Sequence, residues 1–302
     1  MKLYYGRVRN NFITLSGGLN IMKKKVLSLI LTTLMVAGVM VGCSGPSSTT
    51  ATTNTGQTET SDNTEEGSNQ TGYDTVIIGI DDTFAPMGFR DDKNELTGFD
   101  IELAKAVSEI IGFNIEFQPI DWSMKETEIN AGNIDLIWNG YTITDKRKEQ
   151  VLFSRPYLNN RQVVLVLAES GITDFSGLEG KVVATQAMSS SEEAILTNAE
   201  ISDTFKELVT FGTYDECLRD MDAKRTDAVV ADEVLIRYYV ALHADTEYIV
   251  LEDNFGDEEY GIGARKEDAA LIEAINAALD ELKTNGVGAE ISEKWFAEDI
   301  LQ

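Results

Sequence analysis

Short apolar segments typical of strands alternate with segments typical of amphipathic helices over most of the chain after residue 74. The pattern predicts strands at residues 75–80 and 114–120, with a helix over residues 99–111 between them. Further helices are expected near the C-terminus, at residues 268–284 and 288–296. Strands that alternate with helices in this way restrict the chain to an α/β layer architecture.

A central strand is predicted at residues 134–138, an apolar run too short for an independent helix. Gly132 precedes it, and Asn139 and Gly140 follow it as breakers. A loop therefore begins at Asn139.

Thr144 is expected to start a short polar helix with Arg147 in its first turn, close to the loop that carries Thr142. A guanidinium is a rigid fork of donors that matches a carboxylate, so Arg147 is a candidate carboxylate-binding residue. The alternative is that residues 146–148 form a solvated basic run, and spacing alone favours that alternative.

The second half of the chain is expected to enter another group of strands through residues 158–161, followed by strands at 162–168 and 181–186. Ser189 and Ser190 each precede a glutamate by three residues, the spacing of a capping box, so a helix is expected to begin there. The free N–H groups of a helix N-terminus form an anion site.

Residues 222–234 repeat the pattern of residues 130–142, in which a helix end is followed by a strand and then a polar residue. Ligands of open α/β sheets bind at the carboxyl ends of strands. We therefore expect Asp232 and residues 139–142 to face one cleft, although so short a repeat also arises by chance.

The N-terminal region is typical of an exported protein. A basic run at residues 23–25 precedes an apolar run at 26–42 that ends at Gly42 and Cys43. This pattern resembles a bacterial lipoprotein signal in which Cys43 becomes lipidated, and the alternatives are a plain transmembrane anchor and an ordinary secretory signal. A run of about 17 residues is at the lower limit for a membrane span, which favours the lipoprotein.

We predict three segments that precede the folded part. Residues 1–21 are a leader wrongly included in the sequence, because Met22 directly precedes the basic run and is the expected start. Residues 22–42 are the signal peptide. Residues 43–72 are nearly devoid of apolar side chains and form a disordered tether. The folded part then has about 230 residues, enough for two modest lobes.

Several classes of function are excluded by composition. The formal charge of the 302-residue chain is -26, which makes nucleic acid an improbable partner. After residue 72 only one cysteine, Cys217, remains beside the single histidine His243, so no disulfide or zinc site is expected. Gly261 and Gly263 lack the context of a dinucleotide site. We predict no cofactor, no metal and no catalytic residue.

Several motifs together resemble the polar amino-acid-binding proteins of ABC importers, the glutamine-, histidine- and lysine/arginine/ornithine-binding family. They are D-D-T-F-A-P-M at 81–87, G-F-D-I-E-L-A at 98–104, N-I-D-L-I-W-N-G-Y-T-I-T-D-K-R-K at 133–148, F-S-R-P-Y at 153–157 and Y-G-I-G-A-R-K at 260–266. The resemblance extends over residues 75–296. It implies a type II, periplasmic-binding-protein-like fold of two α/β lobes that are joined by two hinge strands.

By this resemblance, lobe 1 consists of residues 73–156 and 261–302, lobe 2 of residues 162–255, and the hinge of residues 157–161 and 256–260. The resemblance implies that Arg147 binds a ligand carboxylate and that Asp232 binds an ammonium group. The other residues that it assigns to the ligand site are Asp81, Phe84, Trp122, Asn139, Gly140, Thr142, Gln186, Ser189 and Ser190.

Plainer interpretations exist for some of these residues. Phe84 and Trp122 are also what ordinary core aromatics look like, and Asp232 is also suited to the N-cap of a helix. Met188 stands where the family usually has glycine, so we expect its side chain to narrow or shift the loop that carries Ser189.

We therefore expect a monomeric, lipid-anchored receptor on the outer face of the cell membrane, which captures a polar L-amino acid and delivers it to an ABC importer permease. The carboxylates of Asp81, Glu258 and Glu259 favour arginine first and glutamine second. The alternatives are an extracytoplasmic dehydratase with the same fold and an amino-acid sensor without a transport role.

Overall fold

The computed structural model describes residues 71–302. The predicted leader, the signal peptide, Cys43 and nearly all of the tether lie outside these residues. Within residues 71–302, no helix is both long and apolar enough to cross a membrane.

The first sheet, called sheet A, has five strands in the order β5-β1-β6-β13-β7. Strand β1 pairs in parallel with β5 and β6, whereas β13 is antiparallel to β6 and β7. The strands are β1 (Thr75–Ile80), β5 (Asn114–Pro119), β6 (Leu136–Ile137), β7 (Leu152–Phe153) and β13 (Gly263–Ala264).

Strand β6 is shorter than the predicted strand at residues 134–138. The Asp135 carboxylate accepts the hydrogen bond of the Ile77 backbone N–H at 2.8 Å, in the place of a backbone carbonyl. A side chain therefore continues the contact with β1 before the regular ladder begins at Leu136.

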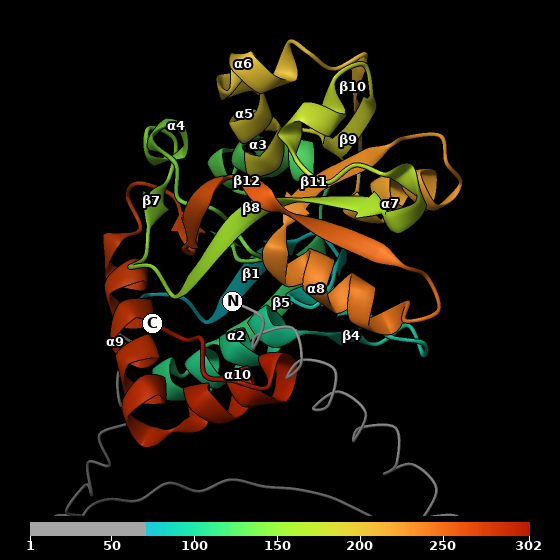
Figure 1. Cartoon of the computed structure of the whole chain (residues 1–302). Coiled ribbons are helices and arrows are strands. Elements are labelled where there is room, and N and C mark those ends of the chain that lie inside the picture. The colour runs from blue at the N-terminus through green and yellow to red at the C-terminus, as the bar shows by residue number, and fades with distance from the viewer. Residues whose placement is uncertain (1–70) are drawn as a thin grey trace, which may run out of the picture. The chain divides into compact units, whose positions relative to one another are not determined.

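Helices α2 (Phe99–Ile111), α9 (Ala269–Asn285) and α10 (Val287–Phe296) lie together beside sheet A (Figure 1). The bounds of α2 agree with the prediction, because Ile101, Leu103, Ala104 and Val107 are buried along one face and Gly112 ends the helix in the left-handed conformation. This packing buries the face of β1 that is turned toward these helices.

The second sheet, called sheet C, has five strands in the order β10-β9-β11-β8-β12. Strand β9 is parallel to β10 and β11, and β8 is antiparallel to β11 and β12. The strands are β8 (Leu158–Leu167), β9 (Val182–Gln186), β10 (Glu207–Phe211), β11 (Ala228–Asp232) and β12 (Tyr248–Tyr260).

The segments predicted as hinges pair with each other: residues 256–260 belong to β12, and residues 157–161 belong to β8 except for Tyr157, which directly precedes it. Asp257 lies opposite Arg161, and Tyr260 lies opposite Leu158. Strand β12 shifts its register on both sides of Asn254. The assignment of these segments as hinges, like the bounds of the two lobes, stays a prediction.

The remaining elements are short or cover the sheets. A small antiparallel sheet, β2-β3-β4, follows β1. The elements not yet given are β2 (Thr83–Phe84), β3 (Gly88–Arg90), β4 (Leu96–Thr97), α3 (Lys125–Asn130), α4 (Asp145–Lys148), α5 (Ser190–Thr197), α6 (Ala199–Ser202), α7 (Tyr214–Asp222) and α8 (Glu233–Leu242), with 3-10 helices at Trp122–Met124, Ala168–Ser170 and Phe175–Leu178.

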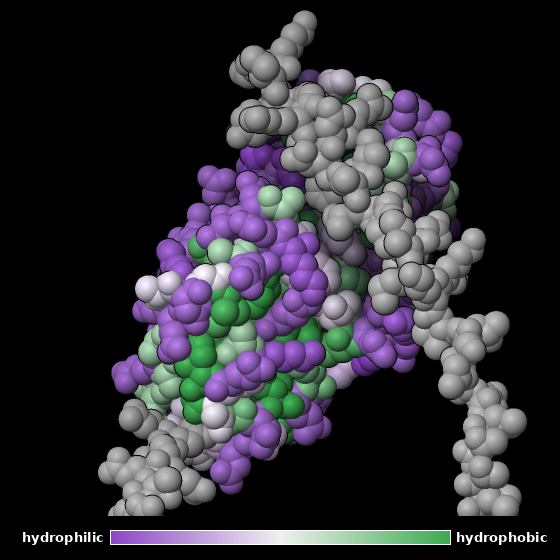
Figure 2. Space-filling model, turned by 90° about the horizontal axis from the view of Figure 1, so that it is seen from below, coloured by the Kyte–Doolittle hydropathy of each residue, from purple (hydrophilic) through white to green (hydrophobic). Residues whose placement is uncertain are grey.

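One cluster of buried apolar side chains includes Ile78 of sheet A as well as Leu165 and Val229 of sheet C. Ile291 and Trp295 of α10 are only partly buried against it. On the face shown in Figure 2, hydrophilic residues surround a band of apolar ones.

Candidate functional site

A small, nearly closed cavity lies where strands of the two sheets end. Asp81 and Asn139 follow strands of sheet A, whereas Gln186 and Asp232 end strands of sheet C. The lining residues are Asp81, Phe84, Trp122, Asn139, Gly140, Arg147, Gln186, Ser189, Ser190, Tyr214 and Asp232. The structure thus brings together every predicted binding residue except Thr142, and it adds Tyr214.

Arg147 lies in α4, whose N-cap is Thr144 as predicted. Its side chain is 5% exposed, whereas Lys146 and Lys148 are exposed, so the interpretation as a solvated basic run is wrong for Arg147. The guanidinium donates to the Thr142 carbonyl at 2.9 Å and lies 4.7 Å from the centre of the Tyr141 ring. The hydrogen bond to Thr142 and the contact with the Tyr141 ring therefore hold one edge of the buried guanidinium in place.

Thr142 itself lies just outside the cavity lining and connects the two sheets. Its hydroxyl donates to the Ser190 hydroxyl at 2.9 Å. Ser190 is the first residue of α5, so Thr142 holds the loop of Arg147 against a helix N-terminus.

The N-terminus of α5 is capped differently from the prediction. The Ser189 hydroxyl accepts from the Glu192 backbone N–H at 3.1 Å, as a capping box requires. The Glu192 carboxylate, however, accepts from the N–H of Met188 at 2.6 Å rather than from Ser189. The cap thus also holds the residue before Ser189.

Met188 adopts a left-handed backbone conformation with φ of 57°, which is costly for any residue with a side chain but not for glycine. Its side chain is 51% exposed and does not line the cavity. The Met188 side chain therefore does not narrow the cavity, because the backbone turns it toward solvent, and the alternative that it shifts the loop stays a prediction.

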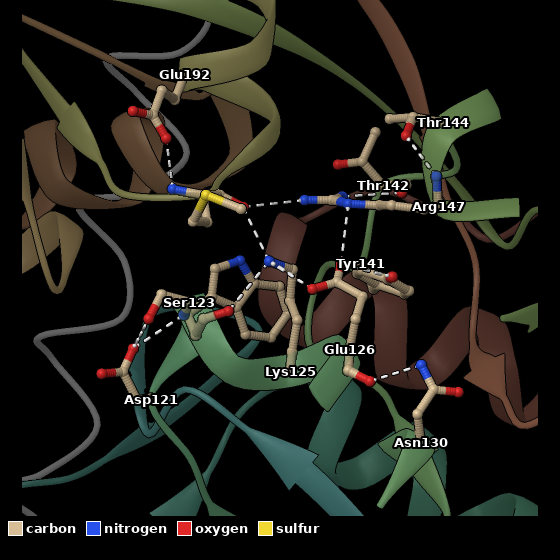
Figure 3. Close-up of polar contacts among 12 residues, drawn as sticks. Asp121, Ser123, Lys125, Glu126, Asn130, Tyr141, Thr142, Thr144, Arg147 and Glu192 are labelled. Atoms are coloured by element: carbon tan, nitrogen blue, oxygen red, sulfur yellow. Dashed lines mark hydrogen bonds and ion pairs between the residues drawn. The ribbon is translucent and has the colours of Figure 1, made fainter. Parts of the chain in front are cut away.

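The same turn directs the Met188 carbonyl oxygen at two cations of the sheet A side, Lys125 and Arg147, which are labelled in Figure 3. Lys125 donates to it at 2.8 Å, and the Arg147 guanidinium lies at 3.5 Å. Lys125 also donates to the Trp122 carbonyl at 3.0 Å. The prediction missed Lys125, because a lysine in the first turn of a polar helix gives no sign that it will be buried.

Asp81 is buried in a part of the cavity wall separate from the contacts of Met188 with Lys125 and Arg147. Its carboxylate accepts from the Thr83 hydroxyl at 2.6 Å and from the Gln186 amide, which reaches across the cavity, at 2.8 Å. Asn139 holds the backbone, because its side-chain oxygen accepts from the Asp81 N–H at 3.0 Å. Burial raises the pKa of the Asp81 carboxyl, and the hydrogen bonds from Thr83 and Gln186 oppose this shift.

Asp232 is 3% exposed at the start of α8. It occupies the N-cap position, as the plainer interpretation predicted, but its side chain makes no capping hydrogen bond. The carboxylate instead accepts from Asn160 at 2.8 Å, Gln162 at 3.1 Å and the Tyr260 hydroxyl at 2.5 Å. These neutral donors hold the carboxylate in place at the cavity.

The aromatic residues Phe84 and Trp122 line the cavity and are also packed among other rings. Phe84 lies 5.7 Å from Tyr214, and Trp122 lies edge-on at 6.0 Å from Tyr141. Tyr214 was missed because it only reaches the cavity once α7 is placed on sheet C. Its hydroxyl lies 2.5 Å from that of Ser191.

Gly140 explains how the chain passes so close to Phe84. Its φ is +58°, and a Cβ atom at this position would lie 2.5 Å from a carbon of the Phe84 ring. Its backbone N–H donates to the buried Asp100 carboxylate at 2.8 Å. No residue with a side chain fits here unless the ring moves.

Residues that often carry chemistry lie elsewhere. Cys217 is buried, and burial raises the pKa of its thiol well above the ordinary value. His243 is exposed at the end of α8. Among residues 71–302, no group of three or more His, Cys, Asp or Glu side chains is arranged to hold a metal ion.

Comparison with protein families matches residues 76–298 to the bacterial extracellular solute-binding proteins, family 3. The arginine-binding extracellular protein ArtP of Bacillus subtilis (strain 168) is 29% identical over 232 residues, which are 75% of this chain and 88% of ArtP. The L-cystine-binding protein TcyJ of Escherichia coli (strain K12) is also 29% identical, over 76% of this chain and 85% of TcyJ.

Two solved structures are similar as well. An ABC uptake transporter substrate-binding protein from Streptococcus pneumoniae with bound histidine has a TM-score of 0.75 and 39% identity, over 77% of this chain and 96% of that one. An ancestral arginine-binding protein bound to arginine has a TM-score of 0.69 and 36% identity, over 74% and 98% of the two chains.

Proposed function

Because the chain belongs to family 3 of the bacterial extracellular solute-binding proteins, we propose that it binds an L-amino acid outside the cytoplasm and delivers it to the permease of an ABC importer. The two-lobed, periplasmic-binding-protein-like fold predicted from the sequence is confirmed by this membership and by the similarity to solved structures.

One observation carries the proposal: Arg147 and Asp232 are both buried and line the same cavity. Arg147 forms an ion pair with Glu126 at 3.6 Å, and no residue within 71–302 forms one with Asp232. A zwitterion that leaves water needs a partner for each of its charges. An amino acid provides the carboxylate and the ammonium group that match these two residues.

We assign the α-carboxylate to Arg147, with help from Thr142 and the backbone N–H groups around Ser189 and Ser190. The hydrogen bond between Thr142 and Ser190 supports this assignment, because it brings the loop of α4 to the N-terminus of α5. The α-ammonium group then binds Asp232, with the Gly140 carbonyl and the Thr142 hydroxyl as further acceptors.

The ligand side chain would lie between Phe84 and Trp122 with its polar end at Asp81. We propose arginine as the first candidate and glutamine as the second. The buried Asp81 carboxylate supports a side chain that donates hydrogen bonds, because its two oxygens can accept more hydrogen bonds than those from Gln186 and Thr83. Tyr214 adds a second aromatic wall beside Phe84.

Closure of the two lobes over the ligand would place Arg147 and Asp232 in contact with the same ligand molecule. We propose residues 157–161 and 256–260 as the hinge, with lobe 1 as residues 73–156 and 261–302 and lobe 2 as residues 162–255. The antiparallel pairing of β8 and β12 supports this hinge, because both connections then rotate together.

The family is extracellular, and the position of this chain in the envelope is a further proposal. We propose that Cys43 carries a lipid that anchors a monomeric receptor to the outer face of the cell membrane. The named relatives are binding proteins, and we propose that this chain binds its amino acid without converting it.

A thermal-shift panel tests the function. Residues 73–302 are unfolded, refolded and mixed with each of the common amino acids and with ornithine, citrulline and cystine. A ligand at a hundred times its dissociation constant stabilises the protein by about 2.7 kcal/mol. A shift with arginine supports the full proposal, and a shift with glutamine, histidine or cystine supports the receptor but not its first ligand. If no amino acid shifts the transition, the proposal is wrong.

A further inference from the structure

Two carboxylates meet over strand β8, which lies between β11 and β12 in sheet C. Asp232 in β11 lies opposite Gln162 in β8, and Glu258 in β12 lies opposite Asn160 in β8. Asn160 and Gln162 are two positions apart, so their side chains lie on the same face of the sheet. The neighbouring strands therefore bring Asp232 and Glu258 to the same pair of amides from opposite sides.

The two carboxylates share their donors. The side-chain nitrogen of Asn160 lies 2.8 Å from the Asp232 Oδ1 and 2.7 Å from the Glu258 Oε1. The side-chain nitrogen of Gln162 lies 3.1 Å and 2.9 Å from the same two oxygens. Each nitrogen lies within hydrogen-bond distance of both carboxylates, so the two carboxylates lie close together. Asp232 lines the cavity, which places the pair at the cavity wall.

No cation within residues 71–302 forms an ion pair with either acid. Arg161, between Asn160 and Gln162 in β8, lies on the other face and pairs with Glu233 at 2.5 Å. The titratable groups nearest the pair are the hydroxyls of Tyr260 in β12 and Tyr214 in α7, and α5 adds the neutral Ser190. The pair thus has only neutral hydrogen-bond partners, and the cation that lines the same cavity, Arg147, forms its ion pair with Glu126 instead.

Two close carboxylates without a counter-charge do not both ionise near neutral pH, because each penalises the charge of the other. Burial, and then the charge of Asp232, raises the pKa of Glu258. Before the ligand binds, one proton therefore belongs to the pair. An ammonium group at Asp232 brings the missing positive charge and lowers the affinity of the pair for that proton.

We propose that Glu258 is a positioning residue of the ammonium site, and that binding of the amino acid releases one proton from the Asp232–Glu258 pair to solvent. This inference rests on the proposed function. The ligand keeps its ammonium proton, and the O–H bond that breaks belongs to the carboxyl pair. Affinity for the amino acid should therefore rise with pH while the free protein still holds the proton.

Titration calorimetry with the full-length protein measures this proton directly. L-arginine, L-glutamine and L-histidine are each titrated at one pH in phosphate and in Tris, whose ionisation enthalpies differ. The difference in binding enthalpy between the two buffers gives the number of protons released, and we expect about one per ligand. The Glu258→Gln variant should bind with the same enthalpy in both buffers.

Glu252→Gln provides the matched control, since Glu252 is an exposed glutamate of the same strand β12 and does not line the cavity. It should release the same proton as the wild-type protein. A wild-type binding enthalpy that is equal in both buffers would overturn the inference and leave the proposed function intact, as would unchanged proton release in Glu258→Gln. If neither these three amino acids nor any other member of the thermal-shift panel binds, the proposed function and this inference both fail.

Discussion

The Lys125 ammonium donates a hydrogen bond of 2.8 Å to the Met188 carbonyl, which joins α3 on the sheet A side to the loop after β9 of sheet C. Lys125 is 1% exposed, and burial together with the charge of Arg147 lowers its pKa to about 8. A buried cation that has an acceptor on each side of the cavity favours the arrangement in which the two sheets meet.

Replacement of Lys125 by methionine should weaken amino-acid binding by roughly tenfold, the size expected for one hydrogen bond to a charged group. The variant loses a contact of the closed arrangement, so ligand must supply more of the free energy of closure. Calorimetric affinities of Lys125→Met and of Lys105→Met, an exposed lysine of α2, check this. Equal affinities in the two variants would contradict it.

Arg147→Ala should abolish amino-acid binding and leave the fold intact, with an affinity at least about a hundredfold lower. Arg147→Lys should restore little, because an ammonium group cannot make two parallel hydrogen bonds to a carboxylate. Calorimetry measures the affinity and circular dichroism the fold. Arg219→Ala serves as the control, since Arg219 is an exposed residue of α7 that pairs with Asp215. Near-native affinity of Arg147→Ala would refute the assigned role.

Asp81→Asn should lower the affinity for arginine much more than the affinity for glutamine, because the amide keeps the shape but loses the charge that faces a guanidinium. A ratio of affinities changed by roughly tenfold or more is expected for one lost charge pair. Asp82→Asn is the control, since Asp82 pairs with Arg90 at 2.5 Å on the surface. If both ligands lose affinity equally, Asp81 does not select the side chain.

Stability should fall as pH rises from about 4 to about 7, because burial raises the pKa of Asp100 from 3.8 to about 7. Over this window the unfolded chain has lost the Asp100 proton while the folded protein still holds it, so each pH step favours unfolding. Asp100→Asn should remove a fall on the order of 1 kcal/mol or more. Urea unfolding at the two pH values, with the exposed Asp245→Asn as control, measures it. A fall unchanged in Asp100→Asn would contradict the prediction.

The sequence predicted the elements whose boundaries are set locally. The bounds of α2 are correct because its apolar stripe ends at Gly112, and the start of α4 is correct because Thr144 caps it with its own hydroxyl. Strand β6 came out shorter because Asp135, a side chain, takes over part of the ladder. Local sequence signals thus predict whether a segment is a helix or a strand better than they predict how many of its residues pair with the neighbouring strand.

The candidate site shows a similar division. Asp232 ends a strand, and the order of elements along the chain was sufficient to expect it at the cleft. Arg147 lies in α4, and its role was predicted only through the family resemblance, because spacing alone favoured a solvated basic run. Lys125, Tyr214 and the Asp232–Glu258 pair depend on how β8 aligns with β12 and how the two sheets face each other. No local pattern encodes such a long-range register.

The close approach of Gly140 to Phe84 has a consequence for how such a receptor diverges. At this end of the cavity the backbone itself forms the wall, so nearly every replacement of Gly140 would push the ring aside. Elsewhere the lining consists of side chains such as those of Asp81, Gln186 and Tyr214, which single codon changes can exchange one at a time. Duplicated copies of this gene can therefore acquire new ligands, or be engineered as biosensors, while the grip on the amino-acid backbone is inherited unchanged.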